Sequence, residues 1–572
     1  METPLLLSSP TAVSRLKTGE KSGLLALSFV IVAFGQPAWS DWLGLLTAVV
    51  GFAIFWRVLL DIPKAKKRFF LAMGWCTGIQ LIQLSWFFSH PYFYIYGVTL
   101  LCSLLIGLQW GVLAIWIRVK NFNDLFRLLA LAGFWTILEW SRLFLLSGLP
   151  FNPVGLTLTS ALYPMQLASI GGVYGLSFWV ILTNLLLLRA WILTARGIGQ
   201  WIAVSCVAFF PYAFGLGHFY LHEKSFTEDS RSLKVVLVQS ALPIEENIGF
   251  QSAKEARQFV LDEWRHVLAT LQKQRGRLID LIVFPEYLVP YGTYHHIFPV
   301  EEIHQLFQEL FGEILHAYPT KGSPYIDEFW TDQGTQWLTS NAYLAQTVAN
   351  LFRAHVVIGL EDSHYENQHK AHAYSSAFHF IPESNQLPNH YEKRVLVPMG
   401  EYIPFSWCQK LAAKYGVTGS LTCGNSAKVF DGPVPFGASI CYEEMYGHLM
   451  RENRMQGAEL LVNLTNDGWY PQSRLPKQHF DHARLRTVEN GIPLVRACNT
   501  GITGGVDSLG RIVGVLGDNP MQSQEVADSL YLDVPLYHYQ TFYPKYGDLP
   551  IIILSCLFIL IGMKRSKISN SR

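Results

Sequence analysis

The sequence predicts two connected parts: a polytopic membrane domain of about eight helical spans, and a layered α/β domain outside the cytoplasm. Three observations support this prediction. Long apolar runs occupy both ends of the 572-residue chain. Between them, short β-rich segments alternate with helical patterns. The Lys and Arg residues between the apolar runs fall on alternate sides of the predicted membrane, which is the charge asymmetry of membrane proteins.

Composition and charge divide the chain at the same places. Only 15% of the residues are charged, whereas a soluble domain has about a quarter. Residues 1–221 carry a net charge of +8, residues 222–548 carry −11, and residues 549–572 carry +4. This composition excludes a disordered chain and a disulfide-rich miniprotein. The acidic middle part also argues against a nucleic-acid partner, because phosphate binding requires Lys and Arg.

The apolar runs set the first and last boundaries. Seven of them are consecutive within residues 1–221, and most reach the ~17–25 residues that a helix needs to cross a bilayer. The eighth is shorter, so it must extend into residues 546–550 or lie in a thinned bilayer. We therefore predict seven spans in residues 1–221 and a final span with a basic tail in residues 549–572. The runs lie near residues 23–40, 43–60, 69–88, 93–117, 125–146, 165–188, 199–221 and 549–563.

Positive residues orient these spans. Lys and Arg precede the first run and follow the second, fourth, sixth and eighth, whereas the connections after the first, third and fifth runs contain neither. By the positive-inside rule both termini are cytoplasmic, and residues 222–548 lie outside, in the periplasm or its equivalent. The first run could alternatively be a cleaved signal peptide, which would leave this placement unchanged.

One charged pair falls within a predicted span. Glu139 and Arg142 lie at the outer end of the fifth span and share a helix face, because they are three residues apart. Charges inside a membrane are commonly functional, and contact with a phospholipid headgroup is one such function. The alternative is that the pair only orients the helix at the interface.

Residues 222–548 alternate between strand and helix patterns. Helical patterns lie at 253–274 and 477–490. The alternation predicts a layered α/β domain around a sheet, and the segment is long enough to bury its own core. The predicted strands are residues 233–239, 278–284, 355–360, 373–381, 435–440, 459–464 and 493–497.

Three short motifs in this domain contain candidate catalytic groups. A buried strand that reads Ile-Val-Phe-Pro ends in Glu286. The stretch Tyr-Glu-Lys-Arg-Val-Leu-Val-Pro contains Lys393, and the small-residue strand Phe-Gly-Ala-Ser-Ile runs into Cys441. At a strand-to-helix turn, helix N-terminal amides lower a thiol pKa and can stabilise an oxyanion. Taken singly, each motif is more typical of a turn carboxylate, a surface Lys or a core Cys.

Taken together, in the order Glu286, Lys393, Cys441, the motifs resemble the Glu-Lys-Cys triad of the nitrilase (carbon–nitrogen hydrolase) superfamily. Residues 462–469 and 484–501 resemble the segments that follow the nucleophile in that superfamily. The resemblance covers roughly residues 233–535. It implies an α-β-β-α sandwich fold for residues 222–548.

A nitrilase-like domain after seven spans and before a final one is similar to one branch, the bacterial apolipoprotein N-acyltransferases. The variants Pro-Glu-Tyr, Val-Pro-x-Gly-Glu-Tyr-Ile-Pro and Cys-Tyr-Glu are typical of that branch. The resemblance implies an inner-membrane enzyme that moves an acyl chain from a phospholipid, through a thioester, to the α-amino group of the N-terminal diacylglyceryl-cysteine of an apolipoprotein. One departure is the long separation between Glu286 and Lys393, with the extra chain around residues 291–341.

The resemblance also implies roles for the triad. Cys441 is the nucleophile that forms the thioester. Glu286 is the general base that takes the thiol proton and later one from the amine. Lys393, with a backbone amide near residue 441, holds the tetrahedral oxyanion.

Three neighbouring residues are expected to support the triad. Glu401 orients Lys393 or supports its charge, since a bare buried Lys would tend to lose its proton. Tyr442 shapes the pocket. Glu443 matches a functional carboxylate of the family.

The reaction is expected to need no cofactor and no metal, because a thiolate can attack an ester unaided. His364, His369 and His372 have a loosely metal-like spacing, but we expect them in a polar loop without a metal site. Cys408 and Cys423 could pair in an oxidising compartment. The expected partners are the phospholipid donor, the apolipoprotein acceptor and surrounding membrane lipids, and the chain is expected to be a monomer.

Two other functions fit part of the pattern. One is a membrane-anchored nitrilase-type amidase, and the other is a transporter or sensor with an inactive enzyme-like domain, against which the intact triad argues. Residues 287–294 and 403–407 are aromatic and flank the motifs. We expect these stretches to form an apolar rim at the lipid surface. The alternative is that Phe405 and Trp407 are buried packing residues.

Overall fold

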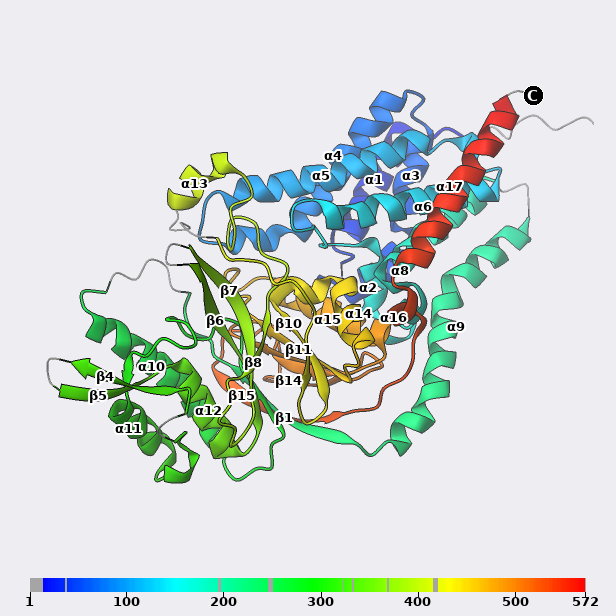
Figure 1. Cartoon of the computed structure of the whole chain (residues 1–572). Coiled ribbons are helices and arrows are strands. Elements are labelled where there is room, and N and C mark those ends of the chain that lie inside the picture. The colour runs from blue at the N-terminus through cyan, green and yellow to red at the C-terminus, as the bar shows by residue number, and fades with distance from the viewer. Residues whose placement is uncertain are drawn as a thin grey trace, which may run out of the picture.

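The chain folds into a bundle of helices joined to a sandwich of two sheets (Figure 1). The structure is a computed structural model. It describes residues 14–36, 39–193, 197–244, 250–320, 323–331, 334–367, 370–414 and 420–570.

A helix forms at each of the eight apolar runs. The second run is split into α2 and α3 by a π-helical turn. The helices are α1 (Thr18–Ala33), α2 (Asp41–Leu46), α3 (Phe52–Leu60), α4 (Ala65–Gln83), α5 (Ile95–Trp116), α6 (Leu125–Ser141), α8 (Ala168–Ile192), α9 (Ile198–Glu228) and α17 (Leu549–Asn570).

Four helical stretches in the described part of the chain are long and apolar enough to cross a membrane. They are Asp41–Leu60, Tyr94–Trp116, Ala168–Ile192 and Ile198–Glu228. The remaining runs also form helices, for example α1 with 16 residues and α6 with 17. The chain therefore contains a helical domain suited to a membrane. The number of eight membrane spans and their orientation across the membrane stay predictions.

Small residues bring the bundle helices into close contact. On α5, a Cβ added to Gly111 would lie 3.0 Å from the ring of Phe69 on α4. On α6, a Cβ added to Gly133 would lie 2.9 Å from the Cα of Ser555 on α17. Lipid provides no hydrophobic drive between helices, so close backbone packing of this kind stabilises the bundle. It also joins the last helix of the chain to the N-terminal helices.

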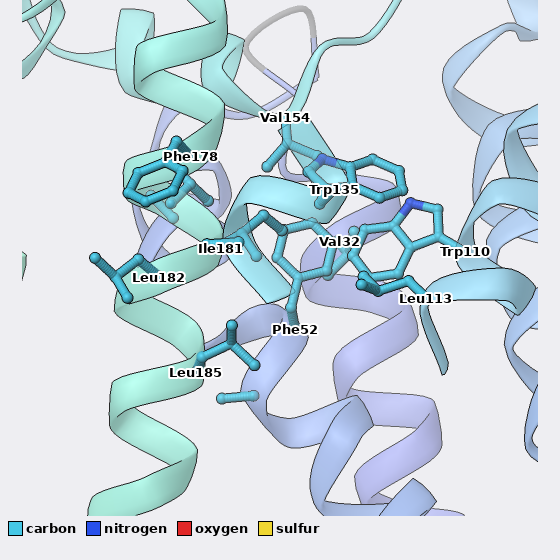
Figure 2. Packing of buried hydrophobic residues seen from close by; sticks show 14 of the residues in the cluster. Val32, Phe52, Trp110, Leu113, Trp135, Val154, Phe178, Ile181, Leu182 and Leu185 are labelled. Atoms are coloured by element: carbon cyan, nitrogen blue, oxygen red, sulfur yellow. The ribbon is translucent and has the colours of Figure 1, made fainter. Parts of the chain in front are cut away.

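Aromatic side chains fill the centre of the bundle. Phe52 stacks on Trp110 with ring centroids 4.7 Å apart, and Trp110 lies 4.5 Å from Trp135. Figure 2 shows these rings among aliphatic side chains of neighbouring helices. The three rings come from three different helices, so they lock α3, α5 and α6 together.

The charged pair predicted in the fifth span is buried inside this bundle. Arg142 donates to Glu139 Oε1 at 3.0 Å, and the same oxygen accepts the backbone N–H of Val154 at 2.8 Å. Arg142 also donates to the carbonyl of Phe151. Glu139 is 2% exposed and Arg142 5%, so the structure favours a role in holding the chain after α6 over contact with a headgroup.

The sandwich consists of two six-stranded sheets. The first has the order β15-β1-β2-β6-β7-β8 and the second β14-β13-β12-β11-β10-β9. Strands β1, β2 and β6 run parallel, as do β10, β11 and β12. The bounds in the first sheet are β1 (Ser232–Gln239), β2 (Leu281–Val283), β6 (His355–Asn367), β7 (Lys370–Phe380), β8 (Asn389–Glu392) and β15 (Asp528–Pro535). Those in the second are β9 (Val429–Asp431), β10 (Pro435–Ile440), β11 (Leu460–Thr465), β12 (Leu494–Cys498), β13 (Gly504–Val506) and β14 (Ile512–Val515).

Alternation of side chains builds the layers. On β1, Val235 and Leu237 face the second sheet, whereas Val236 and Val238 face outward against helices. Helices α10 (Ala253–Leu271) and α12 (Asn341–Phe352) cover the outer face of the first sheet, and α14 (Gly447–Met455) and α15 (Leu475–Asn490) cover that of the second. The predicted α-β-β-α layering is confirmed.

All seven predicted strands and both predicted helices are present. The predicted polar loop that contains His364 and His372 is wrong, because these residues face each other on the paired strands β6 and β7. His369, the third residue of that spacing, lies outside the described residues. Cys408 is buried, Cys423 is exposed, and neither forms a disulfide in the described part of the chain.

The extra chain at residues 291–341 forms a small lobe. It contains β3 (Phe298–Pro299), α11 (Val300–Phe311), β4 (Ile326–Thr331) and β5 (Gly334–Thr339), and the three strands pair as a separate sheet. Asn341 donates to the carbonyls of Pro290 and Gly292, which joins the two ends of the segment. In Figure 1 the lobe lies at the lower left, away from the bundle helices.

Both connections to the bundle leave the first sheet at the same edge. Helix α9 extends beyond the predicted boundary at residue 221 to Glu228, and β1 begins at Ser232. The last strand, β15, pairs with β1 in antiparallel register along its whole length, from Ser232↔Pro535 to Gln239↔Asp528. A short helix, α16 (Phe542–Tyr546), then leads into α17.

Candidate active site

The structure brings the three predicted catalytic residues together from separate strand ends. Lys393 Nζ donates to Glu286 Oε1 at 2.8 Å. The Cys441 thiol hydrogen-bonds the same carboxylate. Glu286 is 6% exposed and Lys393 1%. A nucleophile, a carboxylate and a cation therefore share one buried site.

The position of Glu286 depends on a glycine in the neighbouring strand. Glu286 follows β2, and Gly359 of β6 passes directly beside it. A Cβ on Gly359 would lie 2.6 Å from the Cα of Glu286 and 2.8 Å from the backbone nitrogen of Tyr287. Only glycine permits this approach.

Cys441 lies on a strained turn between β10 and a 3₁₀ helix, Cys441–Met445. Its φ is +54°, a region that non-glycine residues seldom occupy. Asn463 Nδ2 donates to the Cys441 carbonyl at 3.0 Å and so holds the turn. Strain of this kind is typical of functional positions.

The expected lowering of the thiol pKa is wrong. Burial raises the pKa of Cys441 well above its usual value, and the carboxylate of Glu286 raises it further, while Lys393 opposes the rise. The expected helix start is only a short 3₁₀ turn, too small to offset these effects. The resting nucleophile is therefore a thiol, and it requires a base.

Lys393 remains a cation because two carboxylates contact it. Burial would lower its pKa, but Glu286 and Glu401 outweigh burial and raise the pKa well above its usual value. Lys393 Nζ donates to Glu401 Oε1 at 2.6 Å, and Glu401 Oε2 accepts the backbone N–H of Val397 at 2.8 Å. Glu401 thus has the contacts that the expected supporting role requires.

The carboxylate of Glu286 is poised to accept a proton. Burial raises its pKa, Lys393 lowers it, and the negative charge of Glu401 raises it. The resulting pKa lies above that of an exposed glutamate, which makes Glu286 a better proton acceptor than an ordinary carboxylate.

Glu443 contacts backbone rather than reacting groups. Its oxygens accept the N–H groups of Arg394, Val395 and Ile440, at 2.6, 3.1 and 2.8 Å. They also accept the hydroxyl of Tyr391 at 2.9 Å. Glu443 therefore ties the segment that presents Lys393 to the turn that presents Cys441, and it is a positioning residue.

Tyr442 packs beside the site. Its ring centroid lies 5.8 Å from Lys393 Nζ, and its hydroxyl donates to the carbonyl of Leu396 at 2.8 Å. The residue is 8% exposed. These contacts agree with the expected role in shaping the pocket.

Sequence analysis missed a buried charge cluster behind the nucleophile. Arg496 lies 3.0 Å from Glu444 and 3.1 Å from Asp467, and His479 lies 3.1 and 3.0 Å from the same two carboxylates. Asp467 also raises the pKa of Cys441. The four residues come from four separated segments, so no local spacing could reveal the cluster.

The two stretches expected to form an apolar rim differ in exposure. Phe405 is 45% exposed and Trp407 75%, and their rings stack 5.8 Å apart. The alternative that they are buried packing residues is therefore wrong. In the stretch 287–294, Leu288 and Val289 are buried in the core, whereas Tyr287 is 40% exposed. That stretch therefore offers less exposed apolar surface than the sequence pattern predicted, and contact of either stretch with lipid stays a prediction.

The nucleophile turn is in direct contact with the helical bundle. The hydroxyl of Tyr446 donates to the carbonyl of Ser147 at 2.9 Å, and Ser147 Oγ donates to the hydroxyl of Tyr402 at 2.7 Å. Tyr470 packs against Trp86, with ring centroids 4.8 Å apart. The site therefore lies at the junction between the two parts of the chain.

This arrangement suits acyl transfer through a cysteine. A carboxylate can take the thiol proton, and a fixed cation can stabilise a tetrahedral oxyanion. The described groups that could hold a metal lie elsewhere, on the outer face of the first sheet.

Two family models match the chain. The carbon-nitrogen hydrolase model matches residues 252–527, and the model of the apolipoprotein N-acyltransferase N-terminal domain matches residues 24–186. The chain is 31% identical over 556 residues to the apolipoprotein N-acyltransferase of Chlamydia pneumoniae, covering 94% of this chain and 96% of that protein. It is 27% identical over 549 residues to the protein of the same name from Geobacter metallireducens, covering 92% and 90% of the two chains.

Proposed function

Because the chain belongs to the apolipoprotein N-acyltransferase family, we propose that it moves an acyl chain from a membrane phospholipid to the α-amino group of the N-terminal diacylglyceryl-cysteine of an apolipoprotein. The chain is an acyltransferase with a nitrilase-like catalytic domain. In this proposal Cys441, Glu286 and Lys393 are the catalytic residues.

One observation carries the proposal: the turn with the nucleophile is hydrogen-bonded to the helical bundle. Tyr446 lies five residues after Cys441 and contacts Ser147 of the bundle at 2.9 Å. An amidase whose spans act only as an anchor requires no such contact. A lipid acyltransferase does, because its ester substrate lies at the membrane surface and the nucleophile must reach it.

The first half-reaction loads the enzyme. Glu286 takes the proton of the Cys441 thiol, and the thiolate sulfur attacks the ester carbonyl of the phospholipid. Lys393 stabilises the tetrahedral oxyanion. When the intermediate collapses, the C–O bond breaks, Glu286 returns the proton to the leaving oxygen, and a lysophospholipid departs from a thioester on Cys441.

The second half-reaction unloads it. The α-amino nitrogen of the apolipoprotein attacks the thioester carbonyl, and Glu286 accepts a proton from that nitrogen. Collapse of the second intermediate breaks the C–S bond and forms an amide. The thiolate of Cys441 then recovers its proton from Glu286, and the site returns to its starting state.

The proposal includes the placement of the protein. The helical bundle anchors it in the bacterial inner membrane, with both termini in the cytoplasm and the catalytic domain in the periplasm. The alternation of positive connections supports this orientation. We propose domain limits of 1–221, 222–548 and 549–572, a monomeric state and no cofactor.

Mass spectrometry of the intact protein tests the central step. We expect purified protein incubated with phospholipid alone to gain the mass of one acyl chain on Cys441, and hydroxylamine to remove it as expected for a thioester. Cys206→Ala should behave like the unchanged protein, because its thiol is exposed on α9, outside the catalytic domain. Absence of the adduct on Cys441 would contradict the proposal.

The two alternative functions predict different results. An amidase would release product from small amides without acylation by phospholipid. A transporter or sensor with an inactive domain would show neither reaction.

A further inference from the structure

A group of titratable side chains outside the active site gathers on the outer face of the first sheet. Asp362 and His364 lie on β6, and His390 and Glu392 lie on β8. Residues two apart on a strand point to the same face. Each strand therefore contributes one imidazole and one carboxylate.

The register of the sheet brings these residues together across β7. Ser376 of β7 pairs with Leu360 of β6 on one side and with Glu392 of β8 on the other. A serine is small, so side chains from the two flanking strands can approach each other above it. Its hydroxyl is buried and lacks a hydrogen-bond partner among the described residues.

The distances fit the edges of a metal coordination sphere. Nε2 of His364 lies 3.0 Å from Asp362 Oδ2 and 3.9 Å from Glu392 Oε1. Nε2 of His390 lies 3.6 and 3.8 Å from the same two oxygens. In a tetrahedral zinc site with bonds of about 2.0–2.1 Å, ligand atoms are separated by about 3.3 Å. The separations that involve Asp362 bracket that value, and the ligand atoms of Asp362, His364 and His390 all lie within 4.8 Å of one another. Glu392 lies beside this group of three.

A second feature points to a ligand. Asp362 is 3% exposed, and its Oδ2 is buried without a well-aligned hydrogen bond in the described part of the chain, although the two imidazoles lie 3.0 and 3.6 Å away. A buried carboxylate whose charge is met only by nearby imidazoles is costly unless a cation compensates it. The side chain of His364 is 54% exposed and that of His390 32%, which leaves a path for an ion to reach the buried oxygen.

We propose that Asp362, His364 and His390 form a zinc site that links β6 to β8. Two imidazoles and one carboxylate are ligands that zinc accepts in tetrahedral geometry, and a water molecule can take the fourth position. His390 lies three residues before Lys393, so a bound ion holds the strand that leads to the active-site cation. The ion takes no part in the acyl transfer.

This site differs from the spacing considered in the sequence. The sequence spacing groups His364 with His369 and His372, and we expected no metal site at those three residues. The structure retains only His364 from that group and brings it together with Asp362 and His390. His390 and Glu392 of β8 follow the β6–β7 hairpin in the chain. They lie close to the residues of β6 because β7 pairs with both strands.

Calorimetry with zinc alone tests the proposal. Full-length protein is purified without a polyhistidine tag, stripped with chelator and titrated with Zn²⁺. We expect one site per chain in the unchanged protein and in His316→Ala, a control histidine that is exposed on another segment. His364→Ala and His390→Ala should weaken that site by at least about tenfold. Equal affinity in His390→Ala would overturn the proposal.

A second measurement covers the case in which the variants fail to fold. X-ray absorption spectroscopy of the zinc-loaded unchanged protein should detect about two imidazole ligands and about two oxygen ligands at about 2.0–2.2 Å. A spectrum without imidazole scattering would overturn the site even if the protein binds zinc. Zinc should also raise the Tm of the unchanged protein and leave that of His390→Ala unaltered.

Discussion

Three charges and one thiol define the resting active site. Lys393 lies between Glu286 and Glu401, and the pKa of the adjacent Cys441 thiol is raised by burial and by Glu286. In the resting site the thiol of Cys441 is therefore protonated. Reaction with stray electrophiles should be slow, because the thiolate is the reactive form.

The first prediction concerns the nucleophile. Cys441→Ala should abolish acyl transfer, and Cys441→Ser should be nearly as poor because a hydroxyl is a weak nucleophile at its own pKa. Transfer of labelled acyl chains to an apolipoprotein acceptor measures the effect. Cys206→Ala, an exposed cysteine on α9, is the matched control and should retain activity. Substantial transfer by Cys441→Ala would exclude the thioester route.

The second prediction concerns the cation. Lys393→Met keeps the bulk of the side chain but removes the charge that faces the oxyanion. We expect the rate of the chemical step to fall by about 10²–10³-fold, the usual effect of losing one oxyanion donor. Single-turnover kinetics measure it.

Lys393→Arg should fail to restore that rate, since a planar guanidinium places its donors differently. An arginine variant with near-normal turnover would show that Lys393 acts only as a general positive charge.

The third prediction concerns pH. Glu286 accepts a proton only when ionised, so acylation should slow as the pH falls through the pKa of Glu286. Burial raises that pKa, Lys393 lowers it, and Glu401 raises it. Glu401→Gln removes the negative charge that raises the pKa of Glu286. The acidic limb of the pH–rate profile should therefore move to lower pH.

The matched control for this shift is Glu452→Gln. It removes the same charge from a carboxylate that pairs with Arg394 near the surface, and the acidic limb should stay in place. A limb that moves to higher pH in Glu401→Gln would contradict the assignment of Glu286 as base.

Sequence patterns predicted the three residues that the structure brings together, but not their electrostatics. Glu286, Lys393 and Cys441 each end or follow a strand with a recognisable motif. The direction of the thiol pKa could not be predicted, because it depends on burial and on Asp467, which lies in another segment.

At the scale of elements, hydrophobic patterning predicted the strands that are buried on both faces. The strands that sequence analysis missed are short, at a sheet edge or partly exposed, such as β8, β14 and β15. Such strands lack a long apolar run. The lobe at residues 291–341 was noticed only as extra length.

The fourth prediction concerns the exposed stacked pair, Phe405 and Trp407. Phe405→Ser and Trp407→Ser should slow turnover of phospholipid in bilayers, because exposed aromatic rings favour the membrane interface. Thermal stability should stay unchanged, since both side chains are largely exposed. Labelling of Cys441 by a small water-soluble thiol reagent measures access to the site and should also be unchanged. Loss of stability together with activity would show that the rings support the fold instead.

At the scale of the whole molecule, the decisive feature is the junction between bundle and sandwich. A hydrogen bond from Tyr446 to the carbonyl of Ser147 and one from Ser147 Oγ to the hydroxyl of Tyr402 connect residues 299 and 255 positions apart in the chain. Contacts of such range leave no trace in local periodicity. The two parts could therefore be predicted separately, but their mutual arrangement could not.

The fifth prediction concerns the full cycle. Both half-reactions use Cys441, so kinetics with two substrates should be ping-pong. Phospholipid alone should release about one lysophospholipid per enzyme in a burst, and apolipoprotein should then restart turnover. Mass spectrometry of released lipid measures the stoichiometry. Continuous release without an amine acceptor would instead indicate a hydrolase.

The pairing of β1 with β15 also limits when the first sheet can close during biosynthesis. These two strands are neighbours in the sheet, yet roughly 300 residues separate them, which a ribosome needs about 15–60 s to add. Throughout that interval the edge of β1 is open, and open edges attract other strands. Synthesis of nearly the whole catalytic domain must precede closure of the sheet, so β15 completes it only shortly before α17 is made.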